Sequence, residues 1–140
     1  MDYQRALLMA PMNATARINL ALLLQAEGHY KLAWHQLSTV IQHGRTNPQA
    51  REARAIINLQ MGHTDAALQD INVAIATRPS PMLYTERGVI HQFTGDLMGA
   101  VADYRKALMV DPSYHLAHYN LGNVLFNQHL IHQVQYSMLL

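Results

Sequence analysis

Histidine is the residue type with the widest chemical scope in this sequence of 140 residues, which contains nine of them. Two pairs are spaced three residues apart, His115 with His118 and His129 with His132, so each pair could lie on one side of a helix and share a metal ion. A zinc site needs three or four converging ligands, usually with cysteine or carboxylate among them. The sequence has no cysteine, and no acidic residue accompanies the second pair. We therefore expect no metal ion and no other cofactor.

The remaining polar groups do not form a catalytic pattern. The nine acidic residues are scattered singly, so no pair of carboxylates can be proposed for acid–base work. There is no glycine-rich loop of the kind that holds phosphate. None of the serines lies in a nucleophile motif; they are Ser38, Ser80, Ser113 and Ser137. The sequence therefore predicts a protein that is not an enzyme.

The composition narrows the classes of partner. Half of the residues are apolar and only 14% are charged, with a formal net charge of +1. A chain with so little net charge has no long-range field to attract nucleic acid or anionic lipid. No stretch approaches the roughly 20 apolar residues that span a bilayer, and the start does not read as a signal peptide. We expect a cytoplasmic protein whose partners are proteins or peptides, without nucleic acid or membrane.

Small residues recur along the chain at a nearly constant spacing. Each of three glycines is followed by an alanine five residues later. Each also has another small residue seven positions before it. The three sets are Ala21, Gly28 and Ala33; Ala55, Gly62 and Ala67; and Gly88, Gly95 and Ala100. Successive units are 34 and then 33 residues apart, and Gly122 opens a fourth unit 34 residues later. Such a period is the sequence signature of a repeat protein.

Each unit has the pattern of two antiparallel helices. In the third unit, apolar residues recur at steps of three and four from Leu97 to Leu108, which is typical of one side of a helix. Gly95 precedes this stripe and can adopt the left-handed conformation that ends a helix. Pro112 ends the second helix, because proline disfavours helix in the residue before it. One hairpin cannot bury its apolar stripes alone, so we expect neighbouring hairpins to stack.

The pattern resembles the tetratricopeptide repeat family. The third unit carries the resemblance through Tyr84, Gly88, Gly95, Ala100, Tyr104, Ala107 and Pro112, and residues 119–123 resemble the signature of a first helix. Arg54 and Arg87 depart from the family pattern, because leucine is usual there. The resemblance implies an all-α, right-handed solenoid of antiparallel helical hairpins.

The resemblance divides the chain into repeats at 14–47, 48–80 and 81–114, with a truncated repeat at 115–140. Residues 1–13 are interpreted as the second helix of a partial repeat, because Asp2 to Leu7 parallels Asp103 to Leu108 and Pro11 parallels Pro112. The chain is thus expected to be a fragment or short form of a longer array. In the last repeat His129 stands where a glycine turn is expected, and a left-handed residue other than glycine costs roughly 1–2 kcal/mol.

In this family the first helices line a concave groove that holds a peptide or a partner helix. The positions that the resemblance assigns to it here are Ile18, Leu22, Glu52, Ile56, Leu59, Thr85, Val89, Phe93, Tyr119, Asn123 and Phe126. Chaperone-binding members grip an acidic carboxyl terminus with basic residues and asparagine, which the first of these positions lack. We therefore expect a scaffold that binds an apolar peptide or amphipathic helix. The alternative is a structural spacer or a self-association segment, with end-to-end association of chains.

Overall fold

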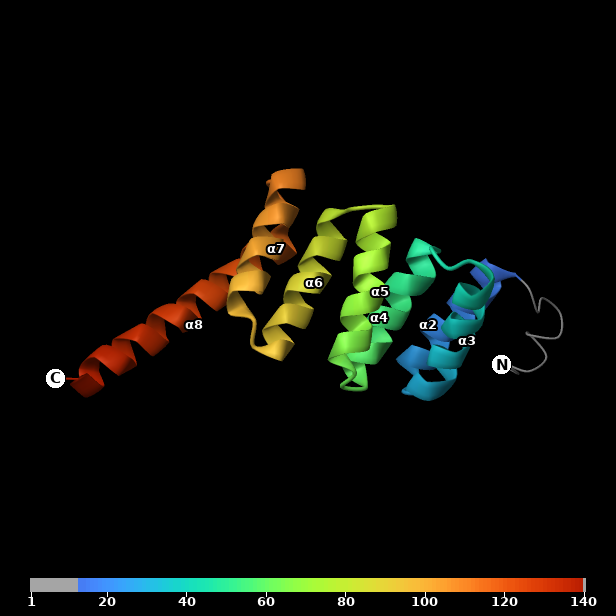
Figure 1. The fold of residues 1–140 in the computed structure, drawn as a ribbon, viewed down its shortest axis with the longest axis horizontal. Helices are drawn as coiled ribbons and strands as arrows, with labels where there is room; N and C mark the ends of the chain where they lie inside the picture. The colour runs from blue at the N-terminus through green and yellow to red at the C-terminus, as the bar shows by residue number, and fades with distance from the viewer. Residues whose placement is uncertain (1–12, 140) are drawn as a thin grey trace. The chain divides into compact units, whose positions relative to one another are not determined.

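The computed structural model describes residues 13–139, which form helices and, within this range, no strand (Figure 1). The helices are α2 (Ala14–Ala26), α3 (Tyr30–His43), α4 (Pro48–Gln60), α5 (Thr64–Thr77), α6 (Pro81–Thr94), α7 (Leu97–Val110) and α8 (His115–Leu139). The expected all-α fold of antiparallel hairpins is confirmed. The helix expected in residues 1–13 lies outside the described residues. The chain divides after Pro79 into two compact units.

Polar side chains begin the first helix of each complete hairpin. The side chain of Asn13 accepts a hydrogen bond from the amide of Ala16, and those of Asn47 and Ser80 do the same for residues three positions on. These bonds satisfy amides that have no partner inside the helix. Proline follows Asn47 and Ser80 directly, at a position where its missing amide hydrogen costs nothing. The first helices therefore start where the local sequence dictates.

Glycine forms the turn in each of the three complete hairpins. Gly28, Gly62 and Gly95 have φ values of 84°, 82° and 84°, and no other described residue has a positive φ. Residues with a side chain rarely adopt this conformation. The turns predicted from the spacing of these glycines are confirmed.

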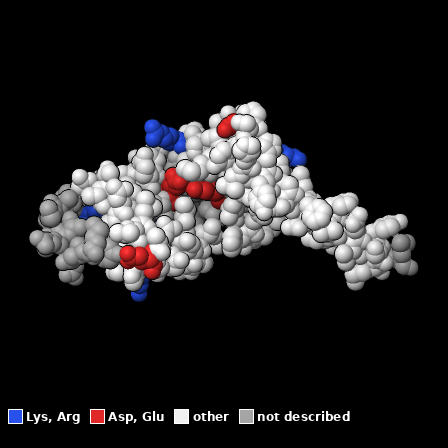
Figure 2. Space-filling view, turned by 180° about the vertical axis from the view of Figure 1, so that it is seen from behind, with Lys and Arg blue, Asp and Glu red and all other residues white. Residues whose placement is uncertain are grey.

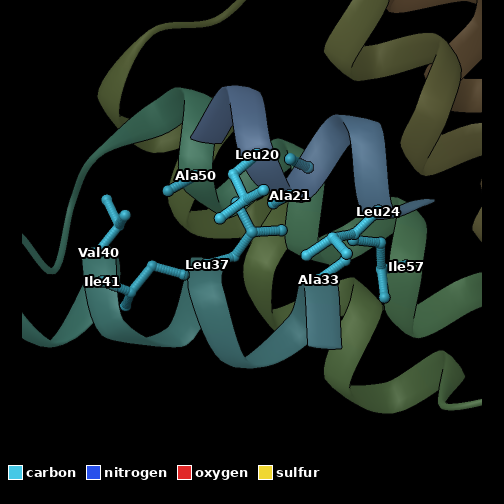
Figure 3. Packing of buried hydrophobic residues seen from close by; sticks show 10 residues of the cluster. Leu20, Ala21, Leu24, Ala33, Leu37, Val40, Ile41, Ala50 and Ile57 are labelled. Carbon is cyan, nitrogen blue, oxygen red and sulfur yellow. The ribbon is translucent and has the colours of Figure 1, made fainter. Parts of the chain in front are cut away.

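The core of the first unit is formed by α2, α3 and α4. Leu20, Leu24, Leu37 and Ile57 are almost inaccessible to solvent and pack against small residues such as Ala21 (Figure 3). Because the small residues occupy the crossing points, the helices can approach closely while the larger side chains fill the space beside them.

A buried carboxylate joins the helices of the first unit. Asp70 on α5 is 1% exposed. Arg54 binds it with two hydrogen bonds of 2.8 and 2.7 Å, and Arg51 and the Asn58 amide donate to it at 2.9 and 3.1 Å. The Trp34 indole on α3 in turn donates to Asn58 at 3.0 Å. Arg54 thus departs from the family pattern because it neutralises this carboxylate.

The second unit repeats the arrangement in its own way. Arg87 on α6 donates to both oxygens of Asp103 on α7, at 2.8 and 2.7 Å. Asp103 is 3% exposed, and the hydrogen bond to it raises the pKa of Arg87. Tyr104, the next residue, is fully buried against Gly88, where a Cβ atom would lie 2.5 Å from its ring. Only glycine leaves room for the ring at this point.

The last helix has no turn at the position where the three complete hairpins have a glycine. α8 continues through His129 to Leu139 without a turn. Among its residues only Ala117 and Val124 are buried, and every residue from His129 to Leu139 is exposed. The physical reason is the absence of glycine at this position. For a histidine, the helical conformation has a lower free energy than the left-handed conformation that a turn would require.

Removal of the Asp70 carboxylate should destabilise the first unit. We expect Asp70→Ala to lower the free energy of unfolding by roughly 3–5 kcal/mol, because two arginines would lose the buried charge that they share. Urea unfolding followed by circular dichroism measures this. The exposed Asp65→Ala on the same helix is the control, and its loss should stay below about 1 kcal/mol. Equal losses in the two variants would contradict a structural role for the buried network.

Tyr104 should make the second unit sensitive to alkali. Burial raises the pKa of Tyr104 to about 12, and the Asp103 carboxylate adds to the rise, because both disfavour the phenolate. The unfolded value is about 10, so stability is complete below pH 10 and is lost as the pH rises towards 12. We expect a loss on the order of 2 kcal/mol by pH 12. Tyr104→Phe should lack this part of the loss in urea titrations at pH 8, 10 and 12. The same alkaline loss in wild type and variant would show that Tyr104 does not cause it.

Candidate binding groove

The first unit contains a hollow between its two first helices, α2 and α4. Its volume is about 530 Å³. Four of the predicted groove residues line it: Ile18 and Leu22 from α2, and Glu52 and Ile56 from α4. Ile18 and Ile56 are half-buried, and Leu22 is 46% exposed. The fold thus brings together four of the predicted side chains, which come from two helices separated along the chain by α3.

The chemistry of this hollow is apolar with a polar margin. The residues that line it and that were not among the predicted set are Ala14, Thr15, Asn19, Asn47, Gln49 and Ala53. Across the whole lining there is one carboxylate, that of Glu52, and no lysine or arginine. Figure 2 likewise shows a surface on which coloured, charged residues are few. Such a hollow can bury an apolar side chain and offer amide groups to a peptide backbone.

The second unit places three predicted groove residues on its surface as exposed rings. Phe93 on α6 and Tyr119 and Phe126 on α8 are 70%, 68% and 62% exposed. Asn123 on α8 is exposed as well. Singly exposed apolar residues are ordinary on a protein surface, but three aromatic rings on two contacting helices form an unusual set. These positions are available to a partner.

Three further predicted positions lie outside the hollow of the first unit and the exposed rings of the second. Thr85 is 1% exposed, and its hydroxyl donates to the carbonyl of Pro81 at 2.8 Å, so its polar group is used inside its own helix. Val89 packs against the core of the second unit around Tyr104. Leu59 is half-buried and is not part of the lining of the first unit's hollow. Thr85 is enclosed, which the repeat pattern alone does not reveal, whereas Val89 is half-buried like Ile18 and Ile56.

The histidine pairs do not build a metal site in the part of the chain that the structure describes. No group of three or more histidine, aspartate or glutamate side chains converges there. His118 instead lies 2.7 Å from the carbonyl of Pro112, and His129 and His132 are exposed on α8. Nor is any helix among residues 13–139 both long and apolar enough to cross a bilayer.

The buried polar network was not predicted, although the sequence contains a signal for it. Arg54 and Asp70 are sixteen residues apart, and so are Arg87 and Asp103. A charged pair that recurs at the same repeat positions indicates a structural contact. These residues support the first helices and do not line the hollow.

Comparison with known proteins agrees with this architecture. The model of a family described as TPR repeat matches residues 94–128. Tetratricopeptide repeat protein 6 of Homo sapiens is 40% identical over 126 residues, which are 90% of this chain and 24% of that protein. Tetratricopeptide repeat protein 13 of Homo sapiens is 30% identical over 101 residues, 72% of this chain and 12% of that protein. The chain therefore spans a quarter or less of these relatives.

Solved structures share the fold at low sequence identity. The crystal structure of MamA superimposes with a TM-score of 0.82 at 20% identity, covering 91% of this chain and 75% of that chain. The first TPR domain of Spaghetti (RPAP3), bound to the HSP90 peptide SRMEEVD, superimposes with a TM-score of 0.76 at 23% identity, covering 84% and 93%. These likenesses show the fold, and the identity to the two named human relatives shows that the chain belongs to the tetratricopeptide repeat family.

Proposed function

We propose that this chain is a protein-binding scaffold that holds an apolar peptide, or the apolar face of an amphipathic helix, against its first helices. The observation that carries the proposal is the hollow of about 530 Å³ between α2 and α4. Ile18, Leu22 and Ile56 offer it apolar surface, and the asparagine and glutamine side chains at its margin can bond a peptide backbone. Binding, without catalysis, is what this set of side chains can perform.

The charge of the hollow selects among peptides. The HSP90 peptide held by the Spaghetti domain, SRMEEVD, carries three acidic side chains in its last four residues. In this chain the hollow presents one carboxylate and no basic side chain. An acidic peptide would lose its hydration here without gaining an opposite charge, which is unfavourable. The proposed partner is therefore apolar and lacks an acidic terminus.

The exposed rings of the second unit support the same class of partner. Phe93, Tyr119 and Phe126 present aromatic surface. Aromatic side chains are enriched at the points of an interface that contribute most of the binding free energy. Each unit by itself thus offers apolar contacts on its first helices, and both suit an apolar ligand.

Ile56→Glu should abolish binding and leave the fold intact. The introduced carboxylate can reach water from this half-buried position, so we expect the free energy of unfolding to change by only about half a kcal/mol. Loss of a central apolar contact is worth roughly 2 kcal/mol, about thirtyfold in the dissociation constant. The measurement is fluorescence anisotropy with labelled amphipathic peptides selected from a library on the wild-type chain.

Leu32→Glu is the matched control for this experiment. Leu32 on α3 is 53% exposed and is not part of the hollow, so this variant should bind the selected peptides like the wild type. If Ile56→Glu folds and still binds, the binding surface lies elsewhere. If Ile56→Glu unfolds, Ile56 belongs to the core.

The acidic peptide SRMEEVD should bind weakly or not at all. We expect its dissociation constant to exceed that of the selected apolar peptides by at least about tenfold, because the lining of the hollow carries no basic residue. Calorimetric titration of both peptides at 50 and 300 mM salt measures the difference. Tight binding of SRMEEVD that weakens with salt would refute the charge argument.

A further inference from the structure

α8 retains the small residue on which a second helix packs, but none of the described residues covers it. In the complete hairpins the corresponding residues Ala21, Ala55 and Gly88 are buried. Gly88 receives the ring of Tyr104. Gly122 lies 34 residues after Gly88, yet it is exposed, and a Cβ atom added there would meet nothing within 4 Å. Gly122 thus has the small size that lets a second helix pack closely, but no described side chain lies against it.

The open surface extends along α8 from this glycine. Leu125 is 42% exposed, whereas its counterparts in the first unit, Leu24 and Asn58, are 2% exposed beneath their second helices. A hollow of about 310 Å³ lies between α7 and α8, lined by Met98, Val101, Ala102, Arg105, Leu125 and Gln128. We call Gly122 and the residues lining this hollow the α8 seat. A helix that packed on α8 as α7 packs on α6 would cover Gly122 and Leu125.

One segment of this chain has the sequence of such a second helix. Asp2 and Tyr3 correspond to Asp103 and Tyr104, and the match continues through Ala6, Leu7 and Pro11 to Ala107, Leu108 and Pro112. Tyr3 is thus the counterpart of the ring that fills Gly88. Residues 1–12 are outside the described part of the structure, so this correspondence is one of sequence.

The surface of α8 that would receive this segment carries no charged residue of its own. From His115 to Leu139 α8 contains no lysine, arginine, aspartate or glutamate, and its projecting end is uncoloured in Figure 2. Apart from Arg105 on α7, the α8 seat is uncharged, which suits the apolar stripe of Tyr3, Ala6 and Leu7. Asp2 occupies the position of Asp70, which Arg51 binds. The residue of α8 at the position of Arg51 is His118, whose ring nitrogen lies 2.7 Å from the carbonyl of Pro112, and the residue at the position of Arg54 is Leu121. Asp2 would therefore lie at the margin of the contact, in reach of water, and the apolar side chains would carry it.

We propose that residues 2–10 of one copy of this chain pack on the α8 seat of a second copy, with Tyr3 against Gly122. The contact is head-to-tail, because it joins two different surfaces of the same molecule, and it can therefore continue from copy to copy. It uses the side of α8 that receives a second helix and does not involve Ile56 or the hollow of the first unit. The proposed occupant is a second copy of the chain, because the segment and the seat that it matches both belong to this sequence.

Light scattering of the purified chain over a range of concentrations tests the proposal. The mass should rise above the 15.8 kDa of one chain as concentration increases. Tyr3→Ala removes the ring and Gly122→Leu fills the opening, so each should raise the dissociation constant about thirtyfold. Replacing an exposed helical glycine by leucine favours helix, so Gly122→Leu should keep its fold. Asn127→Leu, exposed elsewhere on α8, and Ile56→Glu are controls that should associate like the wild type.

Mixing the two defective variants makes the test specific. Tyr3→Ala retains an open seat, and Gly122→Leu retains the segment, so the mixture should form a dimer of one chain of each although neither variant associates alone. A wild type that stays monomeric at every concentration would overturn the proposal. That outcome covers the case in which the segment docks on the seat of its own chain. Association of either variant like the wild type, or a mixture that stays monomeric, would overturn it equally.

Discussion

The close packing of a second helix on one small residue of the first helix is the contact on which every complete hairpin depends. At Gly88 the ring of Tyr104 occupies the space that any side chain would need. Ala21 and Ala55 play the same part in the first unit, where both are fully or almost fully buried. Because the helices approach so closely here, their larger apolar residues meet beside the crossing, and the hairpin becomes rigid enough to position the opposite side of the first helix.

The buried ion pairs add orientation to this packing. Asp70 and Asp103 lie at the same repeat position, and each is held by an arginine from the preceding first helix with two hydrogen bonds. Paired hydrogen bonds to a planar guanidinium are directional, whereas apolar contacts are not. A slip of one helix along the other would leave a buried charge without its partner, which is costly. The network therefore favours one register of the two helices.

Two surfaces with different uses follow from one hairpin geometry. In the first unit, the first helices present Ile18, Leu22 and Ile56 to a hollow with few charges, which supports the proposal of an apolar ligand. On α8 the side that would receive a second helix is uncovered at Gly122. The same arrangement that buries a small residue three times leaves it accessible the fourth time, and this difference is the basis for the proposed association between copies.

The sequence by itself determined the local features of this protein. Glycine at the turns, proline and polar caps at the helix starts, and the spacing of small residues act within a few positions, so the hairpins and the family followed from them. The four residues that line the hollow were assigned by the resemblance to the family. Tertiary structure decided which residues of a column are buried. Thr85 occupies the same repeat position as Glu52, yet Thr85 is 1% exposed whereas Glu52 is half-buried and lines the hollow, because burial depends on helices that periodicity does not place. The partners of Asp70 lie twelve to nineteen residues away on another helix, and α8 continues through His129, where no glycine permits a turn.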